Sequence, residues 1–86
     1  MLKLGNMDNS RVDRLGALAA HIVEHALASG LSWDESIIAF GIAAKAIAAQ
    51  AAVEGTGTLD ACVAHAANRL QYGMDQGADV LKAYLR

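Results

Sequence analysis

The chain has 86 residues, a formal net charge of -2 and a 55% share of hydrophobic residues. This length allows one hydrophobic core and is too short for two independent domains, so we expect a single helical domain over residues 1–86, with residues 1–8 frayed. The mildly acidic charge disfavours nucleic acid and anionic membranes as partners, because both attract basic surfaces.

The composition predicts an all-α protein. Proline is absent, aromatic residues make up 5% of the chain, and alanine, the best helix former, occurs throughout. The single cysteine, Cys62, excludes an intrachain disulfide, and residues 1–10 show no apolar segment or cleavage signal typical of a secretory leader. We therefore expect a cytoplasmic protein.

A first helix is expected over residues 11–29. Ser10 or one of the two polar residues before it can cap its start, and Gly30 can end it in the left-handed conformation. Its apolar residues recur at spacings of three and four, which places them on one stripe. The stripe contains Val12, Leu15, Ala19, Ile22, Val23 and Ala26, with Leu18 and Leu27 at its edges.

The second helix has the clearest start signal, because Ser32 to Glu35 has the S-x-x-E form of a capping box. Residues 55–58, Gly-Thr-Gly-Thr, are expected to stop it near Glu54. A helix that is apolar on two sides is either sandwiched between neighbours or partly reserved for another molecule. One predicted face contains Trp33, Ile37, Phe40, Ala44, Ile47, Ala48 and Ala51, and the opposite face contains Ile38, Ile42, Ala46, Ala49 and Val53.

The same segment, residues 37–53, is apolar enough to require a test for membrane insertion. Lys45 lies at its centre and Gln50 follows, while alanine contributes much less transfer free energy than leucine. We therefore expect no membrane span.

A third, long helix is expected over residues 59–85, with Thr58 as its cap. Gly73 and Gly77 oppose this prediction, each costing about 1 kcal/mol relative to alanine, but a single helical phase runs through the segment. The apolar face contains Leu59, Cys62, Val63, Ala66, Leu70, Met74, Gly77, Val80, Leu81 and Tyr84. Short connections predict an antiparallel three-helix bundle or hairpin with a long third helix.

The segment His21 to His25, H-I-V-E-H, matches the H-x-x-E-H pattern of inverted zinc peptidases over five residues. Two histidines four apart can chelate one zinc ion, and Glu24 could take a proton from bound water. A third ligand is needed, and only His65 or Glu54 could be supposed. On a helical wheel the two histidines lie beside the apolar stripe, so we expect them to shield the edge of the core without binding a metal or cofactor. A metal-binding or zinc-hydrolase-like protein is the alternative.

Two further features have simple interpretations. Cys62 could act as a nucleophile near His65, but its place on the apolar face predicts a small buried hydrophobic residue. Arg11 and Arg14 lie near one helix start, yet two arginines do not make a basic patch. A small nucleic-acid-binding regulator is therefore only a second alternative.

The small and apolar residues favour self-association. Two neighbours within one chain can cover roughly one and a half faces of the second helix, and glycines on the third let another backbone approach closely. The alternative is a monomer that buries both faces by itself. We expect a symmetric homodimer, with another protein as a further partner, and a non-catalytic adaptor, inhibitor or assembly factor rather than an enzyme. The expected interaction surface is Ile38, Ile42, Ala49, Gly73 and Gly77.

Overall fold

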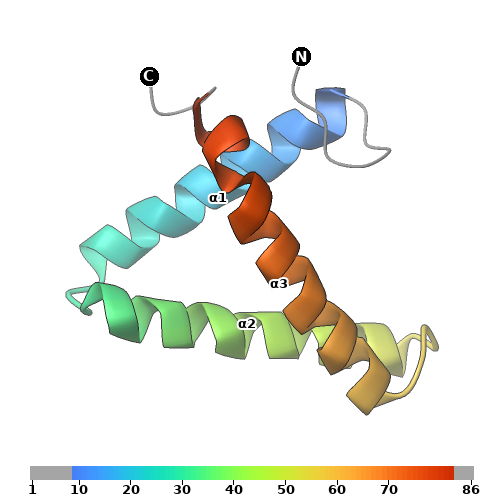
Figure 1. Ribbon diagram of the computed structural model, residues 1–86. Helices are drawn as coiled ribbons and strands as arrows, with labels where there is room; N and C mark the ends of the chain where they lie inside the picture. The colour runs from blue at the N-terminus through green and yellow to red at the C-terminus, as the bar shows by residue number, and fades with distance from the viewer. Residues whose placement is uncertain (1–8, 83–86) are drawn as a thin grey trace. The chain divides into compact units, whose positions relative to one another are not determined.

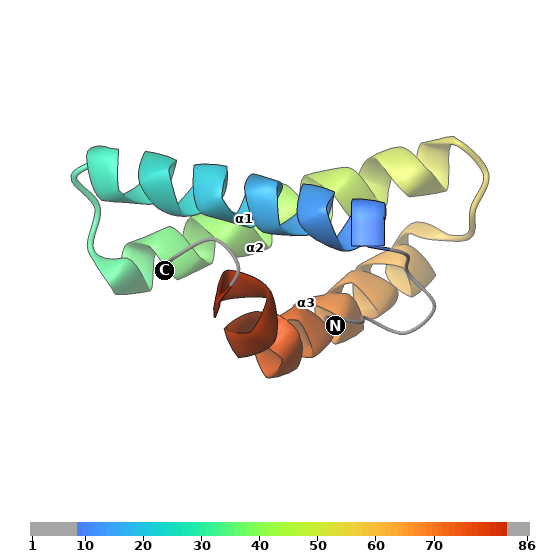
Figure 2. The same cartoon turned by 90° about the horizontal axis from the view of Figure 1, so that it is seen from above.

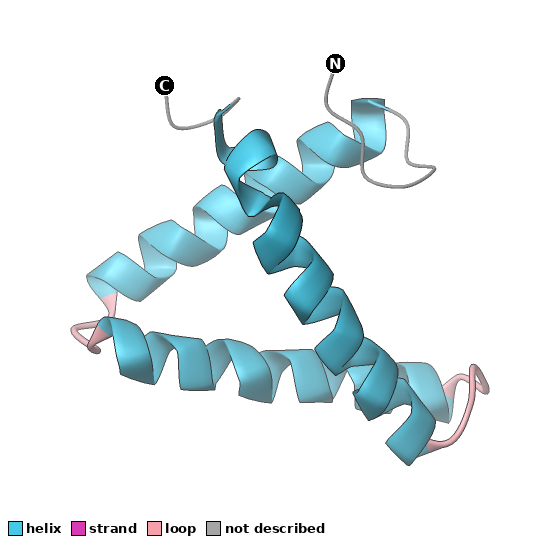
Figure 3. Ribbon diagram, viewed as in Figure 1, coloured by secondary structure: helices cyan, strands magenta, loops and turns pink. Residues whose placement is uncertain are grey.

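The computed structural model describes the backbone of residues 9–82 and the side chains of residues 9–77. This part of the chain forms three α-helices, which are α1 (Asn9–Ala28), α2 (Trp33–Val53) and α3 (Leu59–Lys82) (Figure 1). No strand occurs between residues 9 and 82 (Figure 3). The all-α prediction is confirmed, whereas the predicted fraying of residues 1–8 lies outside the described residues.

Helix α1 begins two residues earlier than the sequence predicts, at Asn9, and ends at Ala28. Two residues later Gly30 has a φ of 81°, the left-handed conformation that glycine adopts without a steric penalty. The predicted stop signal is therefore confirmed. Residues 29–32 then connect α1 to α2.

Both ends of α2 follow the predicted local chemistry. Ser32 is the N-cap, and a complete capping box with Glu35 is present. At the other end Glu54 is the C-cap, and Gly55 has a φ of 93°. The chain leaves the helix there because a residue in this conformation cannot continue it.

Helix α3 begins after a second cap, since the Ala61 backbone N–H donates a hydrogen bond to the Thr58 hydroxyl oxygen at 3.1 Å. Residues 54–58 join it to α2 (Figure 2). The helix continues through Gly73 and Gly77 and has 24 residues, against 20 in α1 and 21 in α2. The prediction of one long third helix is confirmed over the described residues; its predicted end at Leu85 lies beyond them.

The chain divides into two compact units. One unit spans residues 31–73, in which α2 packs with the first part of α3. The other unit combines residues 1–30 and 74–86, and so contains α1 and the last part of α3. The single domain and the bundle arrangement of all three helices stay predictions.

The buried core is small in both units. Val12, 3% exposed, and Ala48, 5% exposed, are the buried apolar side chains among the described residues, and Gly16 and Ser36 are also buried. No large described side chain is fully buried. Much of the apolar surface that the sequence supplies is therefore solvent-exposed in the single chain.

Candidate interaction surface

Helix α2 exposes large apolar side chains on the face predicted to need a partner. Ile38 is 59% exposed and Ile42 is 67% exposed, while Ala49 is half-buried. Within the unit of residues 31–73, α3 is the only other described helix, and one neighbour cannot cover both sides of a helix that is apolar all round. The face that contains Ile38 and Ile42, called the outer face below, is thus not covered within the unit of residues 31–73.

The first predicted face of α2, which begins with Trp33, is buried only in part. Ala48 is buried there, and Phe40, Ala44 and Ala51 are half-buried. Trp33 and Ile47, assigned to the same face, are 80% and 73% exposed, and Ile37 is also exposed. Since 3.6 residues make one turn, Trp33 and Ile37 lie on the same side of the helix as Ala44, so helical periodicity alone does not decide which of these side chains are covered.

The exposed outer face also carries charge, because Glu35, Ile38, Ile42, Lys45 and Ala49 recur at alternating spacings of three and four. This spacing places all five residues on one stripe, which we call the outer stripe. Both charged members are exposed. The sequence analysis treated Lys45 only as an obstacle to membrane insertion, although the spacing itself indicates its place on the stripe.

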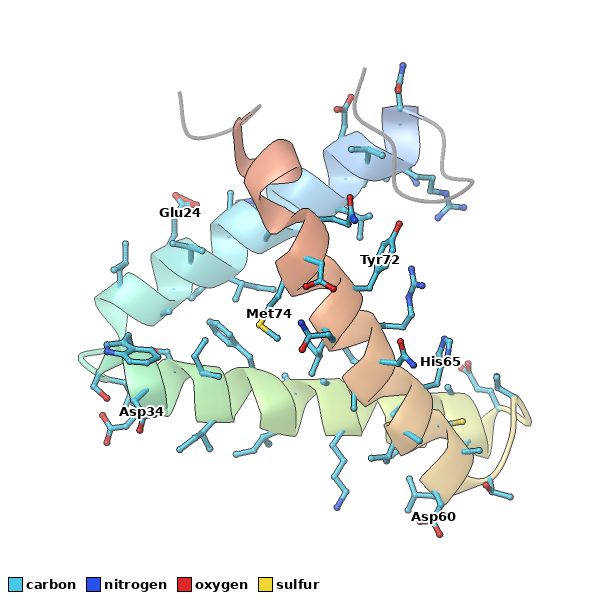
Figure 4. The ribbon with its side chains drawn as sticks, in the orientation of Figure 1. Glu24, Asp34, Asp60, His65, Tyr72 and Met74 are labelled. Atoms are coloured by element: carbon cyan, nitrogen blue, oxygen red, sulfur yellow. The ribbon has the colours of Figure 1, made fainter. Side chains whose placement is uncertain are left out.

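The charge of Glu35 is stabilised by the helix cap. A hydrogen bond from the Ser32 backbone N–H, and then the hydrogen bond with the Ser32 side chain, lower the pKa of the Glu35 carboxyl from its ordinary value of 4.5. The side chain is fully solvent-exposed, and Asp34 beside it adds a second acid in the first turn (Figure 4). The start of α2 is therefore anionic at neutral pH, as suits the positive end of a helix dipole.

By length and composition alone, α2 is the one described helix that could cross a membrane. Only 11% of its most apolar 18-residue segment is buried in the structure. A core helix of a soluble protein would also pass the length and composition test, but it would be mostly buried. Most of this apolar segment is therefore exposed in the described chain.

The α3 glycines make no close contact within the described chain. A Cβ placed on Gly73 or Gly77 would meet no heavy atom within 4 Å, apart from the helix's own backbone and adjacent residues. Gly73 is exposed and Gly77 is half-buried. The close backbone approach expected at these positions is therefore not made by another described segment.

The H-x-x-E-H segment presents a solvated pair of side chains. His21 Nδ1 lies 3.6 Å from Glu24 Oε1, and the two side chains are 74% and 72% exposed. Glu24 projects outward from α1 (Figure 4), and His25 is exposed as well. Over residues 9–77, no three His, Cys, Asp or Glu side chains are grouped so that they could hold a metal ion. The metal-binding alternative gains no support from this geometry.

The remaining candidate residues are on or near the surface. Cys62 is half-buried rather than buried, because it lies in the first turn of α3 next to the connecting loop, where a Cβ on Gly57 would be 3.8 Å from its Sγ. His65, one turn later, is exposed (Figure 4). The Arg69 guanidinium lies 4.4 Å from the centroid of the Tyr72 ring. This arginine therefore makes a cation–π contact within its own helix.

Comparison of the chain with known proteins finds no match. No protein family matches it, and no curated protein or solved structure does so at a significant level. The exposed surface of α2 is the feature of the described chain that bears most on function.

Proposed function

We propose that the chain is a small, non-catalytic helical interaction protein, an adaptor, inhibitor or assembly factor, that works as a homodimer in the cytoplasm. The exposure of Ile38 and Ile42 on α2 is the observation that carries this proposal. Contiguous exposed apolar surface on a small protein usually marks an interaction site. The proposed surface comprises Ile38, Ile42 and Ala49 on α2, with Gly73 and Gly77 on α3.

Within each protomer we infer an antiparallel three-helix arrangement. The connections are short, at residues 29–32 and 54–58, and short connections favour antiparallel neighbours. Such an arrangement leaves the outer stripe of α2 for a second copy. Symmetric dimers are the commonest closed oligomers, and a small core gains most from association.

The apolar gain from this surface is modest. Burying the exposed parts of Ile38 and Ile42 in both protomers supplies about 4–8 kcal/mol, at roughly 1.5–3 kcal/mol for each fully buried side chain. Association itself costs about 4–15 kcal/mol in lost freedom. Further contacts along α2 must therefore contribute to a stable dimer.

We propose a protein partner for α2 rather than a lipid bilayer. Lys45 lies near the middle of the helix, where a charge is most costly in hydrocarbon. Alanine supplies much of the remaining apolar character and gives little insertion free energy. A second copy of the chain can pack against both the charged Lys45 and the alanine-rich surface.

The test is the mass of the chain in solution, measured by light scattering after gel filtration across a micromolar concentration range. We expect twice the chain mass of 9.0 kDa, and the mass of one chain for Ile42→Asp with its helix content retained. Leu27→Asp is the matched control, because Leu27 is 81% exposed on α1, and it should leave the dimer intact. A wild-type mass of one chain at 100 μM would contradict the proposal, as would stable partition of the chain into lipid vesicles.

A further inference from the structure

The order of charges along the outer stripe is self-complementary. Glu35 lies near the start of α2 and Lys45 lies ten residues later, with Ile38 and Ile42 between them. The spacing of alternating threes and fours is that of a coiled-coil seam, in which one helix packs lengthwise against another. Glu35 and Lys45 flank the two isoleucines, so this part of the outer stripe can match its own reversed copy.

The matching register is antiparallel, with a two-fold axis at the level of Phe40. Residues equally far before and after this level then lie opposite one another in the two helices. Ile38 faces the partner's Ile42, and Glu35 faces the partner's Lys45. By symmetry each contact occurs twice, as an isologous interface requires.

Other arrangements place like charges opposite each other or a charge opposite an isoleucine. A parallel pair in register sets Glu35 against the partner's Glu35 and Lys45 against the partner's Lys45. An antiparallel pair shifted by one step along the stripe, toward the end of α2, sets Lys45 against the partner's Ile42. Only the register centred on Phe40 pairs both charges with opposite charges and both isoleucines with each other.

The Glu35 carboxylate can cap α2 and face the partner's Lys45 at the same time. Its Oε1 accepts the capping hydrogen bond from the Ser32 backbone N–H, and a carboxylate has further lone pairs on both oxygens. Close to the proposed axis, Gly41 is exposed, and a Cβ placed there would meet no heavy atom within 4 Å apart from the helix's own backbone and adjacent residues. The small residue lets the two helix backbones approach closely at this point.

We propose that a second copy of the chain docks antiparallel on the outer stripe of α2, with Glu35 of each protomer paired to the partner's Lys45. This inference rests on the proposed self-association and specifies its geometry. The apolar contact supplies affinity, whereas the two ion pairs select the antiparallel register.

The test reverses each charge separately and then mixes the variants. Lys45→Glu places two carboxylates together at each end of the pair, and Glu35→Lys places two ammonium groups there, so each variant alone should dimerise at least about tenfold more weakly than wild type. An equimolar mixture restores both ion pairs in the heterodimer. We expect sedimentation equilibrium to show recovery of the dimer in the mixture, and native mass spectrometry to identify it as the heterodimer.

Controls separate charge pairing from other effects. Arg14→Glu and Asp60→Lys make the same charge changes on exposed residues of α1 and α3, and both should dimerise as wild type does. Ser32→Ala removes the hydroxyl half of the cap that Glu35→Lys also disrupts, and should leave the dimer mass unchanged. Circular dichroism monitors the helix content of every variant.

The outcomes distinguish the two proposals. A wild-type dimer that tolerates both charge reversals, or variants that stay monomeric when mixed, would overturn the antiparallel register while leaving self-association intact. A monomeric wild type would overturn self-association itself. Weaker dimers of each variant by itself, together with recovery of the dimer only when the two variants are mixed, support the pairing of Glu35 with the partner's Lys45.

Discussion

The backbone N–H of Ser32 donates a hydrogen bond to Glu35 Oε1 at 2.9 Å, and the backbone N–H of Glu35 donates one to Ser32 Oγ at 3.1 Å. This reciprocal pair satisfies two N–H groups that have no partner inside the helix. The same glutamate begins the outer stripe. The start of α2 and the proposed interface therefore share one residue.

Removing the cap hydroxyl should destabilise the fold. Ser32→Ala is expected to lower the free energy of unfolding by about 0.5–2 kcal/mol, the usual range for loss of a serine N-cap. Urea denaturation followed by circular dichroism measures the change. Thr56→Ala, in the exposed connection before α3, is the control and should change stability by less than about 0.5 kcal/mol. Equal effects of the two substitutions would argue against the capping role.

The ionisation of Glu35 should depend on Ser32. Because hydrogen bonds from Ser32 lower the pKa of the Glu35 carboxyl below 4.5, the charged form stabilises the fold above that pH. This contribution disappears as the pH falls through the lowered pKa. Ser32→Ala keeps the backbone N–H that lowers the pKa most and removes only the side-chain hydrogen bond, so NMR titration of the Glu35 carboxyl carbon should show the pKa rising part of the way toward 4.5. An unchanged titration midpoint in that variant would contradict the assignment.

The small core predicts a sharp contrast between two valines. Val12→Ala removes two methyl groups from a side chain that is 3% exposed, and should lower the free energy of unfolding by about 1–3 kcal/mol. Val53 is 82% exposed, so Val53→Ala should change stability by less than about 0.5 kcal/mol. Both are measured by urea denaturation at one protein concentration. A loss at Val53 as large as that at Val12 would show that Val53 is buried in solution.

Two glycines should respond to alanine in opposite directions. Gly55 has a φ of 93°, where a Cβ is strained, so Gly55→Ala should destabilise the fold by about 1–2 kcal/mol. Gly73 lies inside α3 with open space around a Cβ, so Gly73→Ala should stabilise the chain by about 0.5–1 kcal/mol. Thermal unfolding measures the direction of the stability change in each variant. Gly73 also belongs to the proposed interaction surface, so dissociation of the proposed dimer by Gly73→Ala would indicate that α3 contacts the partner at this glycine.

Metal should leave the protein unaffected. His21, Glu24 and His25 are exposed, and no three His, Cys, Asp or Glu side chains over residues 9–77 are grouped to hold a metal ion, so protein purified without a histidine tag should carry no stoichiometric zinc. Added zinc should leave the melting temperature unchanged, because a ligand stabilises a fold only by binding its native state. A rise in melting temperature that is lost in His21→Ala and His25→Ala would instead support the metal-binding alternative.

The helix boundaries could be predicted from the sequence because they depend on near neighbours. Ser32 and Glu35 cap α2 through residues three apart, and Gly30 and Gly55 end helices through their own backbone conformation. The continuous phase of α3 outweighed the helix penalty of Gly73 and Gly77 for the same local reason. Sequence periodicity also placed Ile38 and Ile42 on one face of α2, and both are exposed.

Which apolar side chains are covered was decided by the tertiary structure. Trp33 and Ile47 share one predicted face with Ala48, yet Ala48 is buried and the other two are exposed. Periodicity identifies the residues that share a face, but burial depends on the width and position of the helix that packs there, which residues distant in sequence determine. The sequence alone therefore determined three helices and their ends, while tertiary packing decided how much of the apolar surface of α2 stays open to another molecule.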